Sequence, residues 1–249
     1  MGKKFKGKTC VYCGTEGAAQ TGDHVFAREF LPVAYRANLP KVPACAPCNG
    51  AKSALEHYLS AILPFGGRHP QSPAILAADV PRRLDRNARL HRELAHGKRD
   101  GWVSENGLIR PSMALPFEGE KLADLFVLIT RGLAHHHFGV MIPQSYFVGA
   151  GLLVRRAESV LEGLIALNAN ARVLESLGGG LIEYEGAQAV NDPFLTIWRY
   201  RLYGGVVLTD LANPNEAPST IWASSSRSRS QSVLTIDDDD RALSGPLGS

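Results

Sequence analysis

Two short stretches decide the fold of the N-terminal part, Thr9-Cys10-Val11-Tyr12-Cys13-Gly14 and Cys45-Ala46-Pro47-Cys48-Asn49-Gly50-Ala51-Lys52. Together they hold all four cysteines of the 249-residue chain. Each Cys-x-x-Cys pair can form a tight knuckle that presents two thiolates to one ion, as in tetrahedral zinc sites. Two disulfides are the alternative, but we expect a chain without a secretory signal to keep its thiols reduced. The spacing predicts a structural Zn²⁺ bound by Cys10, Cys13, Cys45 and Cys48.

A carboxylate and an imidazole stand side by side between the two knuckles, in Gly22-Asp23-His24-Val25. The second knuckle is followed by the amide of Asn49 and, one helical turn later, by the ammonium of Lys52. Hydrolysis of a phosphodiester needs an activated water and a cation that stabilises charge on the phosphoryl group. A neutral imidazole can take a proton from water near pH 7, and an oxygen-ligated ion such as Mg²⁺ can supply the charge. These residue types, in this order, indicate metal-dependent hydrolysis.

This ordered combination resembles the HNH endonuclease family in three motifs: Cys10-x-x-Cys13, Asp23-His24-Val25 and Cys45-x-x-Cys48-Asn49-x-x-Lys52. The match covers residues 8–60, about a fifth of the chain. The resemblance implies a ββα-metal fold, in which a β-hairpin and a helix enclose one metal ion. It also implies an endonuclease that hydrolyses DNA and leaves a 5′-phosphate.

Carried over position by position, the resemblance implies a role for each residue of the candidate site. His24 would be the general base that deprotonates water. Asp23 and Asn49 would bind the catalytic divalent ion, and Lys52 would contact a substrate phosphate. The four cysteines would hold a structural zinc that fixes this site from outside.

The chain departs from the family pattern after Asn49. Many family members have a second metal-binding histidine about four residues later, where this chain has Ser53. With two side chains and water as ligands, the ion is expected to be Mg²⁺ or Mn²⁺ rather than a catalytic zinc. His57 is no substitute, because eight residues of helix place it roughly 12 Å from Asn49; we interpret it as a surface or packing histidine. Asn38 is not an unambiguous match to the middle Asn of the family name.

Each of these residues also has a structural explanation. Asp23 could cap a turn beside a packed His24, and Asn49 could cap the helix that follows it. A non-catalytic zinc-knuckle module that binds nucleic acid or protein is therefore the alternative function. It predicts that the side chains of Asp23, His24 and Asn49 do not converge.

Positive charge is concentrated near the N-terminus. Residues 1–60 contain eight Lys or Arg and four Asp or Glu, a net charge of +4, against +3 for the whole chain. This asymmetry favours a polyanionic partner, which we expect to be DNA, with RNA not excluded. No apolar stretch approaches the ~20 residues of a membrane span. We therefore expect a soluble, cytoplasmic protein with no membrane partner, and leave homo-oligomers open.

The predicted fold class is α+β, with a small zinc-stapled ββα-metal domain followed by a larger mixed α+β domain. Residues 1–64 would form the HNH nuclease domain, with a flexible basic arm over 1–9. The Pro- and Gly-rich stretch Pro64–Pro73 predicts a linker. Residues 65–223 would form the second domain, whose role the sequence does not indicate beyond targeting or regulation. Residues 224–249 have too little apolar content to order themselves and are predicted to be a disordered tail.

Hydrophobic periodicity places the secondary structure. It predicts helices over 49–59 and 81–95, from 118 onward and over 155–177, a hairpin over 102–109 and strands over 181–185, 195–203 and 206–211. The hairpin would turn at Asn106-Gly107. In the second helix, a run of arginines is predicted to be a solvated face, with phosphate binding as the alternative; these are Arg82, Arg83, Arg86, Arg89 and Arg92.

Three further stretches of the sequence could be binding sites. His135-His136-His137 cannot converge on one ion, because consecutive helical residues point about 100° apart, so one buried and two exposed rings are expected. Arg199 and Arg201 alternate on one strand face and would either contact phosphates or be structural residues of an edge strand. Gly178-Gly179-Gly180 lacks the spacing of a phosphate loop and predicts a flexible turn.

Overall fold

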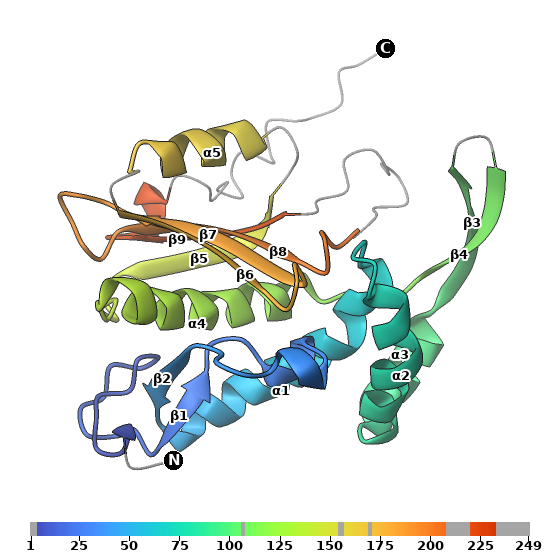
Figure 1. Cartoon of the computed structure of the whole chain (residues 1–249), viewed down its shortest axis with the longest axis horizontal. Coiled ribbons are helices and arrows are strands. Elements are labelled where there is room, and N and C mark those ends of the chain that lie inside the picture. Colours follow the sequence, from blue (N-terminus) through green and yellow to red (C-terminus); the bar gives the residue numbers. More distant parts are fainter. Residues whose placement is uncertain (1–3, 106–107, 154–156, 169–170, 208–219, 233–249) are drawn as a thin grey trace.

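The fold is a stack of layers in a computed structural model that describes residues 4–105, 108–153, 157–168, 171–207 and 220–232 (Figure 1). The helix α5 lies on one face of a five-stranded sheet and the long helix α4 on the other. The N-terminal strands and α1 lie beyond α4, and a separate two-stranded hairpin extends from the opposite end of the molecule (Figure 1). This architecture confirms the α+β class.

The elements have the following bounds. The helices are α1 (Ala46–Ile62), α2 (Ser72–Asp85), α3 (Ala88–Gly97), α4 (Gly119–Phe138) and α5 (Glu158–Ala166), with short 3-10 turns η2 (Arg28–Phe30), η3 (Val33–Tyr35), η4 (Leu63–Gly66) and η8 (Arg229–Gln231). The strands are β1 (Thr21–His24), β2 (Lys41–Ala44), β3 (Arg99–Glu105), β4 (Leu108–Ala114), β5 (Phe147–Leu153), β6 (Arg172–Leu177), β7 (Ile182–Gln188), β8 (Thr196–Leu202) and β9 (Thr220–Ser226).

The N-terminal part consists of an antiparallel strand pair followed directly by a helix. β1 and β2 pair from Thr21 opposite Ala44 to His24 opposite Lys41. The helix α1 starts three residues earlier than expected, so Cys45 is its N-cap and Asn49 lies inside it. Pro47, within the first turn of α1, suits this position because its missing N–H needs no partner there.

The basic arm is not free over the residues described. The backbone N–H of Gly7 donates to the carbonyl of Ala19 at 2.8 Å, and the N–H of Ala19 donates back to Lys8 at 3.0 Å. The ring of Phe5 covers Gly22 so closely that a Cβ there would lie 2.4 Å from it. The expectation of a flexible arm is therefore wrong for this stretch, because backbone pairing holds it to Ala19, just before β1, and the ring of Phe5 packs on β1.

The main sheet is antiparallel throughout, in the order β5-β9-β8-β7-β6. Alternation along β8 buries Trp198, Tyr200 and Leu202. Gly186 lies opposite Trp198 on β7, and the indole occupies the space that a side chain would need. β8 is an interior strand, so the edge position considered for Arg199 is wrong.

One hydrophobic core crosses the domain boundary expected near residue 65. The rings of Phe26 and Tyr184 lie with centroids 5.4 Å apart, although one precedes that boundary and the other follows it. Gly132 of α4 lies against Val25, so the helix packs closely on the segment after β1. The two parts of the chain are thus packed as one body of side chains.

The linker expected over residues 64–73 contains ordered structure. It includes η4 and the start of α2, and Gly67 forms an isolated bridge with Val206. The single helix expected over 81–95 is two helices, because the side chain of Asn87 accepts the N–H of Leu90 and starts α3. This N-cap signal was present in the sequence and was missed.

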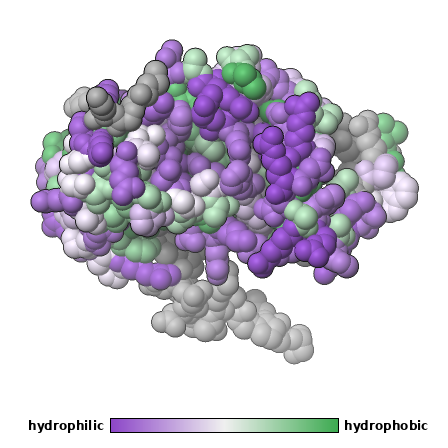
Figure 2. Space-filling view, turned by 90° about the horizontal axis from the view of Figure 1, so that it is seen from below, coloured by the Kyte–Doolittle hydropathy of each residue, from purple (hydrophilic) through white to green (hydrophobic). Residues whose placement is uncertain are grey.

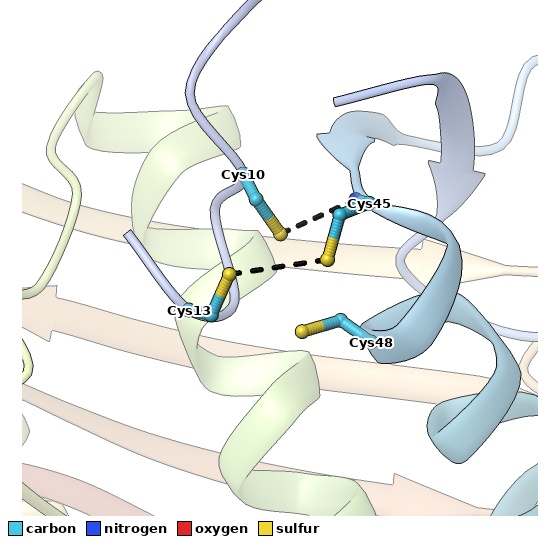
Figure 3. Close-up of side chains that lie close together, drawn as sticks. All are labelled: Cys10, Cys13, Cys45 and Cys48. Atoms are coloured by element: carbon cyan, nitrogen blue, oxygen red, sulfur yellow. Dashed lines mark hydrogen bonds between the residues drawn. The ribbon is translucent and has the colours of Figure 1, made fainter. Parts of the chain in front are cut away.

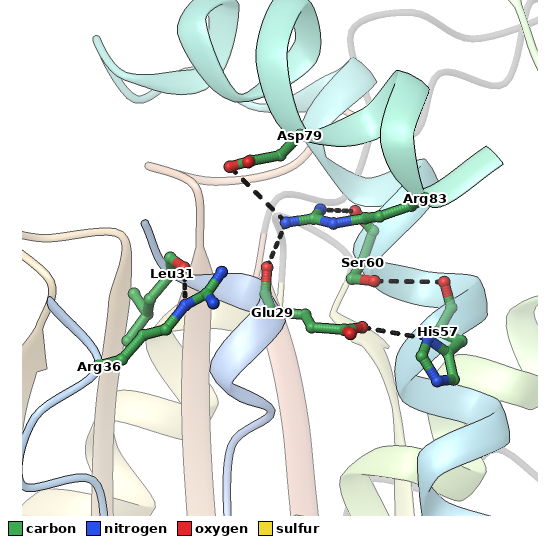
Figure 4. Close-up of polar contacts among 7 residues, drawn as sticks. All are labelled: Glu29, Leu31, Arg36, His57, Ser60, Asp79 and Arg83. Atoms are coloured by element: carbon green, nitrogen blue, oxygen red, sulfur yellow. Dashed lines mark hydrogen bonds and ion pairs between the residues drawn. The ribbon is translucent and has the colours of Figure 1, made fainter. Parts of the chain in front are cut away.

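Arg83 belongs to the interior rather than to a solvated face. Its guanidinium donates to the backbone carbonyls of Ser60 and Glu29 and lies near Asp79 (Figure 4). These bonds fasten α2 to α1 and to η2. The prediction of an exposed arginine run is therefore wrong for this one member.

Two of the expected C-terminal elements are wrong, and a third lies mostly outside the described part of the chain. The helix expected over 155–177 is α5 followed by β6, and β5 was not predicted. Of the strand expected over 206–211, only the bridge at Val206 lies within the described part, and residues 208–211 lie outside it. Ser224, Ser225 and Ser226 are buried in β9, so a disordered tail from residue 224 is wrong; residues 233–249 lie outside the described part. Small side chains fit this buried strand, which is why low apolar content misled the prediction.

No helix in the described ranges is both long and apolar enough to cross a membrane.

The contact between Gly186 and Trp198 gives a test of the sheet packing. We expect Gly186→Ala to lower the free energy of unfolding by about 1–3 kcal/mol, because the added methyl overpacks a buried indole. Gly101→Ala is the matched control, since Gly101 is also in a strand but has no atom near the added methyl, and we expect less than about 0.5 kcal/mol. Urea denaturation measures both, and equal stabilities would contradict the packing described.

Candidate metal centre and nuclease site

The four cysteines converge as the spacing predicts. Their sulfur atoms all lie within 4.8 Å of one another, two from the loop before β1 and two from the start of α1 (Figure 3). The Sγ atoms of Cys13 and Cys45 are 3.9 Å apart. Tetrahedral Zn²⁺ with bonds of about 2.3 Å requires sulfur separations of about 3.8 Å. The cluster is therefore positioned to bind a metal ion, and its chemistry is consistent with structural zinc.

Backbone and hydroxyl groups surround these sulfurs. The N–H of Cys45 donates to Sγ of Cys10 at 3.4 Å, a contact of the kind that orients metal ligands. A hydrogen bond with the hydroxyl of Thr15 lowers the pKa of Cys13 to about 6, whereas burial raises the pKa of Cys48 and of Cys10. A bound cation would favour the thiolate form of all four sulfurs.

Asp23 lies in β1 with a largely buried carboxylate. Its Oδ2 accepts the hydroxyl of Tyr12 at 2.6 Å and lies 3.1 Å from Nζ of Lys52. Both contacts fall on the same oxygen. The other oxygen, Oδ1, has no hydrogen-bond partner within the described residues.

Lys52 is completely buried, and this overturns the expectation that it contacts a substrate phosphate. Its ammonium donates to the carbonyl of His24 at 2.8 Å and pairs with the carboxylates of Asp23 and Glu56. A buried charge is stabilised only when paired and hydrogen-bonded, and here all three partners belong to the protein. Lys52 therefore joins α1 to β1 as a structural cation.

Glu56 completes this network from the next turn of α1. Burial raises its pKa to about 7, despite the opposing attraction of Lys52. The repulsion of Asp23 adds to the increase. The sequence analysis missed both Glu56 and Tyr12, although an acid four residues after Lys52 is a recognisable helical pair. No sequence signal distinguishes Tyr12 from a packed tyrosine in the knuckle.

His24 is the last residue of β1, and its imidazole is half-buried. Burial lowers its pKa, and the positive charges of Lys41 and Arg28 lower it further. The neutral form is therefore favoured at pH 7, as a general base requires. No hydrogen-bond partner of this imidazole is found within the described residues.

Asn49 lies on α1 one turn before Lys52, so the two residues share a face of the helix. Because Lys52 contacts Asp23 and the carbonyl of His24, this face of α1 is directed at the end of β1. The amide of Asn49 is half-buried. Asn49 thus lies on the side of α1 that faces β1, while no hydrogen bond joins its side chain to Asp23 or His24 in the described part of the chain.

The other residues considered lie elsewhere or have other partners. His57 is on the outer side of α1, where Nδ1 pairs with Glu29 at 3.1 Å (Figure 4). Of the three consecutive histidines, His136 is exposed and the other two are half-buried, so the expectation of one buried ring is wrong. His137 contacts the hydroxyl of Tyr184 at 2.9 Å, and Arg199 pairs with two glutamates.

The triple glycine is a turn between β6 and β7 in which all three residues have positive φ. It packs on the N-terminal part, since a Cβ at Gly178 would lie 2.4 Å from the side chain of Leu31. His69 contacts the carbonyl of Gly179 at 3.0 Å. The turn is thus held by specific contacts rather than left free.

Comparisons of the chain with protein-family models, curated proteins and solved structures give no match.

The cysteine cluster predicts bound metal in the purified protein. We expect one Zn²⁺ per chain by elemental analysis, and we expect Cys48→Ser to lose it because only three sulfurs remain. The variant should also melt at least several degrees lower, since metal binding contributes to folding. Ser53→Ala, in the same helix, is the control and should retain the ion. Full zinc content in Cys48→Ser would contradict a four-sulfur site.

Lys52 predicts a large stability effect for a single charge. We expect Lys52→Met to lower the free energy of unfolding by about 3–5 kcal/mol, because Asp23 is left buried without its cation. Lys121→Met is the control, since Lys121 pairs with Glu118 on the surface and should contribute less than about 1 kcal/mol. Thermal and urea unfolding measure both. A Lys52 variant as stable as the control would show that the network does not hold α1 to β1.

Proposed function

We propose that the protein is a metal-dependent endonuclease of the HNH type that hydrolyses phosphodiester bonds in DNA. His24 deprotonates water, and Asp23 and Asn49 bind a Mg²⁺ or Mn²⁺ ion that stabilises the charge of the transition state. The cysteine cluster holds the knuckles on either side of this site. The single observation that carries the proposal is the buried bond from Lys52 to the end of β1.

That bond supports the proposal because it limits where the three side chains can be. Lys52 reaches the carbonyl of His24 and Oδ2 of Asp23 from one residue of α1. Asn49, one turn earlier on the same face of α1, would then lie near the same strand end. An ion between the strand and the helix could take Oδ1 of Asp23 and the amide oxygen of Asn49, both hard oxygen ligands.

The resemblance to HNH enzymes agrees with the order of elements. An antiparallel strand pair, β1 and β2, leads directly into α1, and the candidate ligands come from the strand and the helix. The positive charge of residues 1–60 would attract the phosphate backbone. Lys41 and Arg28, the cations that act on His24, are both exposed and take the phosphate role first expected of Lys52.

A non-catalytic zinc-knuckle module is the second candidate, and one observation favours it. Asp23 and His24 are consecutive residues of β1, so their side chains leave the strand on opposite faces. A site built from both must use the strand end, where the chain departs from the sheet. The binding module would hold nucleic acid or protein without cutting.

Plasmid cleavage in Mg²⁺ or Mn²⁺ tests the proposal. We expect His24→Ala to reduce the cleavage rate about 10²–10⁴-fold through loss of the general base. The wild-type rate should fall as the pH drops through the lowered pKa of His24, because protonation abolishes the base. Lys41→Gln should shift that fall to higher pH by removing a positive charge.

His57→Ala is the matched control, since it removes an exposed histidine from α1 and should cleave at nearly the wild-type rate. Gel-shift measurements accompany each variant. Absence of cleavage by the wild-type protein, with DNA still bound, would replace the nuclease with the binding module. Equal losses in both histidine variants would mean that His24 is not the base.

A further inference from the structure

The hairpin β3–β4 is a two-stranded sheet of its own that stands away from the other layers (Figure 1). Its strands pair from Arg99 opposite Ala114 to Glu105 opposite Leu108. In the chain, the hairpin follows α3 and precedes α4. Neither the metal centre nor the candidate nuclease site uses this ribbon.

One face of the ribbon is exposed and largely apolar; Asp100, opposite Met113, is its charged member and pairs with Lys98. Trp102 lies opposite Pro111, and strand alternation places Ile109 and Met113 on the same face as this pair. The exposed fractions are 75% for Trp102, 72% for Ile109 and 50% for Met113. Large apolar side chains gathered in this way mark an interaction surface.

The segment that contains α2, α3 and the ribbon is basic. Residues 66–114 contain nine Lys or Arg and five Asp or Glu, a net charge of +4, whereas residues 115–249 have a net charge of −5. Arg82, Arg86 and Arg92 are exposed, and no carboxylate pairs with them in the described part of the chain. Strongly hydrophilic side chains lie right of centre in Figure 2 and apolar ones at its right edge, the side of α2, α3 and the ribbon in Figure 1.

We propose that the ribbon and these arginines form a docking surface for duplex DNA. A two-stranded β-ribbon fits the major groove, whose width is about 12 Å. The apolar face would then lie against base edges, and Arg82, Arg86 and Arg92 would contact phosphates of the flanking backbone. A protein partner would suit the apolar face, but it would not account for the unpaired cations at its base.

The surface extends the proposed function and depends only on its DNA-binding part. Asn49 lies near one end of α1, and α2 and α3 follow the other end. The 17 residues of α1 span about 25 Å, roughly seven base pairs of duplex. The ribbon therefore holds DNA at a distance from the phosphate that is cut, which makes its contribution one of affinity and register.

Trp102 is a built-in reporter for the experiment. The other two tryptophans, Trp198 and Trp222, are buried, so acrylamide quenching of the fluorescence reports mainly on Trp102. We would titrate the full chain carrying His24→Ala, without added divalent ions, with a 30-base-pair duplex and with a single strand of the same length. We expect the duplex to lower the quenching constant at least twofold and the single strand to do so less.

Charge reversal tests the arginines by fluorescence anisotropy with the same labelled duplex. We expect Arg82→Glu with Arg86→Glu to raise Kd about tenfold at 100 mM salt, and to reduce the slope of log K against log salt by about two. Arg201→Glu with Arg229→Glu makes the same charge change on exposed residues of the main sheet side, and should alter Kd less than twofold. Trp102→Ser should weaken binding without changing the melting temperature.

Three outcomes would overturn the inference. The first is quenching that the duplex leaves unchanged at saturation, and the second is equal or stronger protection by the single strand. The third is protection that rises with protein concentration alone, which would make the ribbon a contact between two copies. Protection by duplex in a protein that never cleaves DNA would support this surface and refute the nuclease.

Discussion

The buried ammonium of Lys52 is the interaction on which the candidate site depends. It draws together a strand carboxylate, a strand carbonyl and a helix carboxylate, so β1 and α1 cannot separate without exposing two unpaired acids. The four cysteines join the same part of the fold, because two sulfurs come from the loop before β1 and two from the start of α1. A metal ion bound by them would add to the ion pairs of Lys52 in fixing the angle between the strand that carries His24 and the helix that carries Asn49.

The metal cluster could be predicted from sequence because it depends on spacing alone. Two Cys-x-x-Cys pairs can serve one ion with little help from the rest of the fold, and the helix after the second pair shows clear periodicity. The roles of individual residues of the candidate site could be predicted less well. Lys52 has the position of a phosphate ligand in the sequence, and only its burial shows that its charge is used internally. The partners of Lys52 are Asp23, Glu56 and the carbonyl of His24, and of these only Glu56, one helical turn away, could be connected to it from the sequence.

Elsewhere in the fold, the sequence predicted correctly those helices and strands that bury only one face, and it failed for others. α4 and β8 have one buried face each, so period alone located them. β9 is buried on both faces and built largely from serine and alanine, a composition that resembles a linker until the neighbouring strands are known. The predicted domain boundary near residue 65 was wrong for a related reason. Gly66 and Gly67 signal a turn, but whether a turn separates two bodies is decided by the core, and Phe26 joins it from one side and Tyr184 from the other.

The position of β9 in the sheet has a consequence for the order in which the molecule can assemble. This strand comes last in the described chain, yet it lies between β5 and β8. Until about residue 226 has been synthesised, β5 has no strand to pair with, and the five-stranded sheet above α4 is incomplete. High contact order of this kind slows folding and leaves strand edges exposed to other chains. All four cysteines lie in the first fifty residues, so a metal ion could bind them on the ribosome before the sheet closes, while the apolar residues of the core still face water.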